Sequence, residues 1–201
     1  MTSATHEHWY EIPVGPELRQ GDILRRLLVM WLPQELPVLE HVPEDGEPPV
    51  KPEWVVGDWI VMSASCDVDR GAQSYPHALV GRVLPATLET FGARTEKEFK
   101  ERAEVVRKGL DPSKFLLPEH PGAAPPFPVS IVQYRVHVTM PADYLRRSSV
   151  GRRLRLKHPF RETFGAWVGS NMSRVGPENS TLIPGFGVTT WPKDVLRASE
   201  E

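Results

Sequence analysis

This sequence of 201 residues has one cysteine, no long apolar run and no large excess of positive or negative charge. The single cysteine, Cys66, cannot form an internal disulfide, which is usual in a reducing compartment. The longest uninterrupted apolar run is the six residues from Leu27 to Leu32, whereas a helix that crosses a bilayer needs about 20. Twenty-four basic and 26 acidic residues leave a net charge of −2, so the chain as a whole is not a polycation.

These absences set the first expectations about class and location. The N-terminal stretch has neither a basic start nor an apolar core, so we expect no secretory signal, no membrane span and a cytoplasmic protein. Apolar residues make up 40% of the chain and charged residues 25%, which is ordinary for a folded domain. Because a domain averages about 150 residues, we expect a single domain over residues 1–201.

Proline, by contrast, is abundant. The chain has 21 prolines, about twice the usual share of roughly 5%. Proline interrupts helices and removes a strand hydrogen bond, so short elements joined by stiff connections are expected. Residues 1–20 are interpreted as an N-terminal arm, residues 33–53 as an acidic proline-rich loop, and residues 178–201 as a C-terminal tail.

Hydrophobic periodicity predicts about five or six strands and two main helices. The first helix is expected from Thr95 to Lys108, because Thr95 and Glu98 have capping-box spacing and Gly109 follows as a stop signal. The main strands are expected at residues 23–32, 54–63, 77–84, 129–139 and 153–157, and the second helix at residues 159–175. The predicted fold class is α+β, with a small, strongly curved antiparallel sheet or barrel, two main helices and long proline-rich loops.

The turn after the second expected strand is the first place where chemistry is predicted. Cys66 is a candidate nucleophile if a nearby cation lowers the pKa of its thiol, and Asp67 is the candidate catalytic partner. The negative charge of the Asp67 carboxylate, however, disfavours the thiolate. Ser63, Ser65 and Arg70 are candidate ligand contacts in the same turn. The alternative is a buried cysteine that packs as a small apolar residue beside a turn-capping carboxylate. The spacing matches no standard zinc pattern, so neither a metal nor a cofactor is expected.

A basic segment at residues 146–161 is the second such place, with seven arginines or lysines and no acidic residue. If residues 153–157 form a strand, alternate cations lie about 6.5–7 Å apart on one face, a spacing that suits the phosphates of RNA or DNA. The alternatives are a solvated strand face or a patch that pairs with the chain's own acidic loop. The candidate ligand-binding residues are Arg153, Arg155, Lys157, His158 and Arg161.

Asn171 is the last candidate, because it lies among apolar positions of the expected helix at residues 159–175. A buried amide needs hydrogen-bond partners. We therefore expect Asn171 to reach a loop backbone or a neighbouring subunit, which makes this helix a candidate oligomer contact.

Parts of the sequence resemble known groups of proteins. Gly21-Asp22-Ile23, the turn from Ser63 to Asp67 and the segment ALVGRVLPAT resemble uncharacterised bacterial and phage proteins that carry a Ser-x-Ser/Thr-Cys-Asp turn. The order of these elements remotely resembles the PemK/MazF-like group. That resemblance implies an SH3-like barrel with added helices and, for the group, ribonuclease activity within toxin–antitoxin or defence systems. The group's catalytic arginine and threonine have no match here, so only the fold is carried over.

Two functions from different classes stay open on this basis, and whether the protein is an enzyme is undecided. The first is a non-catalytic binding or regulatory module of a bacterial or phage system that contacts nucleic acid or a protein partner through the basic strand. The second is an enzyme, either a PemK/MazF-like endoribonuclease or a hydrolase that depends on Cys66.

Overall fold

The computed structural model describes residues 9–31, 53–65 and 76–173, and this part of the chain forms seven strands and three helices. The strands are β1 (Tyr10–Glu11), β2 (Asp22–Trp31), β3 (Glu53–Val61), β4 (His77–Pro85), β5 (Lys114–Leu117), β6 (Ser130–Pro141) and β7 (Arg153–Leu156). The helices are α2 (Glu96–Arg107), α3 (Ala142–Ser148) and α4 (Phe160–Ser173). The predicted α+β class is confirmed.

The strands form one antiparallel sheet in the order β1-β7-β2-β3-β4-β6-β5. Strands β1 and β5 are its edges, and no strand pairing joins them in the described part of the chain, so the sheet is open rather than closed into a barrel. A side-chain hydrogen bond connects the two edges, from the Tyr10 hydroxyl to the carbonyl oxygen of Pro118, just after β5, at 2.7 Å.

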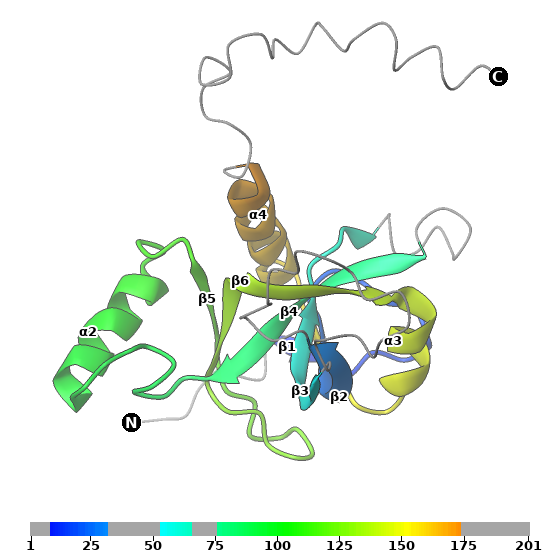
Figure 1. Cartoon of the computed structure of the whole chain (residues 1–201), viewed down its shortest axis with the longest axis horizontal. Coiled ribbons are helices and arrows are strands. Elements are labelled where there is room, and N and C mark those ends of the chain that lie inside the picture. The colour runs from blue at the N-terminus through cyan, green and yellow to red at the C-terminus, as the bar shows by residue number, and fades with distance from the viewer. Residues whose placement is uncertain (1–8, 32–52, 66–75, 174–201) are drawn as a thin grey trace, which may run out of the picture.

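Both faces of the sheet are covered, because the central strands carry apolar residues at consecutive positions. Successive strand residues point to opposite faces. In β3 and the residue after it, Ile60 and Met62 join the core on the side of α4, while Trp59 and Val61 join the core on the side of α3. The structure therefore has a helix on each side of a sheet that is buried in the middle (Figure 1).

Helix α2 covers the end of the sheet next to β5, away from α3 (Figure 1). Its predicted N-cap is confirmed, since the Thr95 Oγ accepts a hydrogen bond from the Glu98 amide at 3.2 Å. Val106 of α2 packs with Ile131 of β6 and with Leu116 of β5. Ile131 is therefore fully buried beneath α2.

Two elements were not among those expected from the sequence. Residues 114–117 form strand β5, and residues 142–148 form helix α3. The two glycines of α4 do not pack against another backbone: a Cβ at Gly165 would lie 2.7 Å from the side-chain Oε1 of Gln20, and one at Gly169 would meet nothing within 4 Å.

Candidate binding groove

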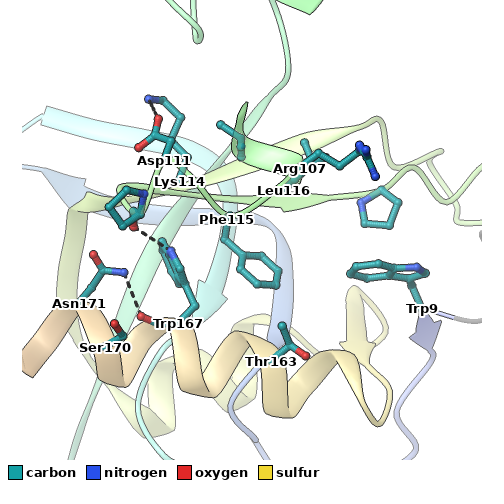
Figure 2. Close-up of a pocket in the computed structure, with 14 residues that line it drawn as sticks. Trp9, Arg107, Asp111, Lys114, Phe115, Leu116, Thr163, Trp167, Ser170 and Asn171 are labelled. Carbon is teal, nitrogen blue, oxygen red and sulfur yellow. Dashed lines mark hydrogen bonds and ion pairs between the residues drawn. The ribbon is translucent and has the colours of Figure 1, made fainter. Parts of the chain in front are cut away.

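A cavity of about 750 Å³ lies between α2, β5 and α4 (Figure 2). Its position follows from the sheet order, because β5 is the last strand and has a neighbour, β6, on only one side. Leu116 of β5 packs against α2, while Phe115 packs against α4. The two helices thus form opposite walls, and the free edge of β5 lies between them. We call this cavity the β5 groove.

Aromatic rings line the α4 side of the β5 groove. The rings of Phe115 and Trp167 approach with their centroids 5.5 Å apart, and both point into the cavity (Figure 2). The Trp167 Nε1 donates a hydrogen bond to the Pro112 carbonyl oxygen at 2.9 Å, which fixes the orientation of the indole. At the other end, Trp9 stacks on Phe160 with centroids 3.7 Å apart and planes 13° apart. These contacts hold the apolar surface in place before any ligand binds.

The charged side chains that line the groove are already engaged in ion pairs. The Lys114 Nζ lies 2.8 Å from the Asp111 Oδ2. Burial raises the pKa of Asp111, but hydrogen bonds from Lys114 and Ser113 outweigh this effect, and the pKa is lowered overall. Arg107 donates two hydrogen bonds of 2.6 Å to Glu104, and these chiefly lower the pKa of Glu104 to about 2.

The net charge of the lining follows from three of these groups. Arg107, Lys114 and Asp111 line the cavity, whereas the carboxylate that binds Arg107 does not. The lining therefore carries two cations and one anion.

The backbone of β5 presents free hydrogen-bonding groups to the groove. The Tyr134 amide donates to the Ser113 carbonyl oxygen at 3.0 Å, which sets the alternation of the β5–β6 ladder. Because residues of an antiparallel strand alternate in direction, Phe115 bonds toward β6 while Lys114 and Leu116 direct their backbone groups away from it. By the same alternation the Leu116 N–H and C=O point away from β6, and in the described part of the chain no backbone hydrogen bond outside the regular strand pairings involves them.

Of the residues predicted from sequence, Asn171 is the one found in the β5 groove. Its side chain is buried, as expected, but its Nδ2 donates to the Trp167 carbonyl oxygen at 2.9 Å, one turn earlier in the same helix. The expected contact to a loop backbone is therefore wrong for this amide nitrogen. The proposed oligomer contact through this helix stays a prediction.

The expected row of exposed cations on residues 153–157 is wrong for its two arginines. Arg153 and Arg155 are both 6% exposed. Arg155 binds Asp22 through hydrogen bonds of 2.6 and 2.9 Å, and Arg153 lies 3.7 Å from the same carboxylate. Strand β7 runs between β1 and β2, and the N-terminal arm covers the face on which these arginines lie, so neither guanidinium faces solvent.

The other basic candidates lie nearer the surface. Lys157 is half-buried and His158 is exposed. The His158 Nδ1 lies 3.2 Å from the Glu162 carboxylate, and the Arg161 guanidinium donates to the same residue at 3.0 Å. These residues do not form the continuous row that the alternating pattern predicted.

The turn with the predicted cysteine chemistry is described only in part. The Ser63 Oγ accepts a hydrogen bond from the Leu79 amide at 2.8 Å, and the Ser65 Oγ accepts one from the Gln20 amide at 3.1 Å. Cys66, Asp67 and Arg70 lie outside the described residues. Their catalytic or ligand-binding roles stay predictions.

Two kinds of feature do not occur in the described segments: a cluster of metal-ligating side chains and a membrane-spanning helix. No group of three or more potential metal-ligating side chains occurs in them. No helix there is both long and apolar enough to cross a bilayer.

Sequence reasoning missed the groove, although its parts were visible. Trp9, Phe115 and Trp167 are large apolar residues in three separate segments of the sequence. Such residues indicate burial. None of them indicates that three segments so distant in sequence meet at one edge of a sheet.

Comparison with known proteins identifies no relative of this chain. No family model matches the chain, and no curated protein or solved structure matches it. The function must therefore be inferred from the residues themselves.

Proposed function

We propose that this protein is a non-catalytic binding module that holds a segment of a protein partner in the β5 groove. The observation that carries this proposal is the combination of a pre-formed aromatic wall with an unpaired strand edge in one cavity. Rigid aromatic side chains supply apolar contact area at little entropic cost, and an unpaired edge supplies backbone donors and acceptors. A polypeptide offers both kinds of complement.

The charges favour a protein partner over nucleic acid. Binding of a phosphate backbone requires cations that are free to contact it. Arg153 and Arg155 are buried against Asp22, and both cations of the groove are held by carboxylates. A nucleic acid carries a phosphate at every nucleotide and would have to displace those carboxylates, whereas a mostly apolar peptide would leave the ion pairs in place.

The lining of the groove also favours binding without catalysis. No histidine or cysteine of the described chain lines it. Its one carboxylate, Asp111, already accepts hydrogen bonds from Lys114 and Ser113 and has a lowered pKa, which is the reverse of what a general acid needs near neutral pH.

The test measures binding of short peptides by titration calorimetry. A library of capped seven-residue apolar peptides is first screened against the full chain, and the tightest binder is then titrated into variants. Trp167→Ala removes part of the aromatic wall and is expected to weaken binding at least about tenfold, as for a buried aromatic anchor. Trp54→Ala is the matched control, because Trp54 is an exposed tryptophan on β3 outside the groove.

A second variant tests the groove independently, in case Trp167→Ala does not fold. Thr163→Lys places a long side chain on an exposed position of α4 that lines the groove, and circular dichroism checks that the fold is kept. Equal peptide affinity in all variants would overturn the proposal. A 20-nucleotide single-stranded RNA that binds with steep salt dependence, and equally well after Trp167→Ala, would instead support the nucleic-acid alternative.

A further inference from the structure

We propose that the partner segment binds as an added β-strand along β5, with large apolar side chains at two alternate positions and an acidic residue between them. This inference rests on the proposed function, because it specifies how the β5 groove holds its protein segment. It follows from three features of the groove: its backbone groups, the different chemistry of its two walls, and the net charge of its lining.

The backbone groups determine the register of the added strand. Leu116 directs both its N–H and its C=O away from β6, and Lys114 directs at least its C=O the same way. An extended peptide satisfies these groups with every second residue, as in other cases of strand addition. Beyond β5 the Pro118 carbonyl oxygen accepts the Tyr10 hydroxyl, so the ladder ends there.

The walls determine the side-chain pattern. Successive residues of a strand point to opposite sides, so one set of ligand side chains faces α4 and the other faces α2. The α4 wall is aromatic, with Phe115 and Trp167. From Thr163 to Asn171 it spans about 12 Å at 1.5 Å per residue. Alternate residues of a strand are about 6.8 Å apart, so this wall holds two large apolar side chains.

The α2 wall determines which ligand residue fits between the two apolar side chains. Leu116 and Val106 provide an aliphatic surface there, and Arg107 lies at its rim. Lys114 is paired with Asp111, but Arg107 shares the Glu104 carboxylate with Lys108, so a single negative charge on the ligand gives charge complementarity beside Arg107. A ligand carboxylate would share the guanidinium of Arg107 with Glu104, so the hydrogen bonds between Arg107 and Glu104 would not have to break.

The test uses two capped heptapeptides of identical composition, acetyl-GTFEFTG-amide and acetyl-GTFFETG-amide. Only the first places both phenylalanines on one side of an extended strand and the glutamate on the other. We expect the first to bind the full chain at least about tenfold more tightly. Replacing its glutamate with lysine should weaken binding several-fold in the wild-type protein but not in Arg107→Ala.

A scan of backbone N-methylation tests strand addition without altering the protein. Each residue of GTFEFTG is N-methylated in turn, which removes one donor. Methylation at every second residue should weaken binding about tenfold, while methylation at the intervening residues should change it less than about threefold. Similar losses at all positions, or equal binding of the two heptapeptides, would overturn strand addition.

These outcomes separate the inference from the proposed function. If the N-methylated peptides all bind alike while Trp167→Ala still abolishes binding, the groove holds a peptide but not as a strand. If neither the heptapeptides nor the peptide library binds in a way that depends on Trp167, both proposals fail.

Discussion

At the scale of single residues, Asp22 explains why two arginines that the sequence places on a strand face are internal. Its carboxylate is fully buried and contacts the guanidinium groups of Arg155 and Arg153. The hydrogen bonds that Arg155 donates to Asp22 raise the pKa of Arg155, whereas burial lowers the pKa of Arg153. Arg153 also donates to the carbonyl oxygens of Gly15 and Glu17, so this cluster ties the N-terminal arm to β7.

Removal of that carboxylate should therefore be costly. Asp22→Ala leaves two buried guanidinium groups without their counter-ion, and we expect it to lower the free energy of unfolding by about 3–5 kcal/mol in urea denaturation. The control is Asp143→Ala, which breaks an exposed ion pair with Arg146 and should cost less than about 1 kcal/mol. Similar losses for the two variants would contradict the role given to Asp22.

At the scale of elements, α2 is held in position by its own side chains at both ends. Thr95 caps its first turn, and Arg102 donates to the carbonyl oxygens of Phe91 and Gly92, which anchors the preceding loop. In its last turn Glu104 accepts two hydrogen bonds from Arg107. Because Arg107 lines the β5 groove, this last pair links the helix end to the proposed binding site.

The Glu104–Arg107 pair gives a prediction about pH. The hydrogen bond from Arg107 lowers the pKa of Glu104 from 4.5 to about 2 in the folded protein. A depressed carboxyl pKa favours the folded state above the unfolded-state value of 4.5, and this contribution is lost as the pH falls toward 2. Carboxyl NMR shifts of Glu104 should therefore titrate well below pH 4. In Arg107→Ala the midpoint should rise toward 4.5, and an unchanged midpoint would show that the pair is not formed.

At the scale of the whole molecule, Tyr10 is the side chain that connects the two edges of the open sheet. It comes from β1 and donates its hydroxyl to the Pro118 carbonyl oxygen just after β5. Its ring packs against His120 and Phe127, whose segment covers one side of the core. Burial raises the pKa of the Tyr10 hydroxyl well above its ordinary value. The contact between the sheet edges thus depends on an un-ionised tyrosine.

Stability should accordingly fall at alkaline pH. With a folded-state pKa raised above the unfolded value of about 10, Tyr10 stabilises the fold fully below pH 10 and loses this contribution as the pH rises further. Between pH 10 and 11 the free energy of unfolding should fall by up to about 1.4 kcal/mol more in the wild type than in Tyr10→Phe. Parallel pH profiles for the two proteins would contradict this.

The sequence by itself determined what depends on near neighbours in the chain. Helix α2 follows from the spacing of Thr95 and Glu98, and strand β3 from the run of β-branched and aromatic residues between 54 and 63. The α+β class and most strand positions follow from the same local patterns, because periodicity reports which residues share a face. The roles proposed for Cys66 stay predictions, because that residue lies outside the described part of the chain.

Only the tertiary structure decided which faces are covered and which edges stay free. Alternation at residues 153–157 predicted an exposed basic face, but contacts with the N-terminal arm and Asp22 bury that face. Four residues with a weak local signal became strand β5 because β6 pairs with them, and their outer edge was left open between two helices. Pairing and coverage depend on segments more than 100 residues apart in the chain, such as Trp9 and Phe115 at the β5 groove, and no local pattern contains that information.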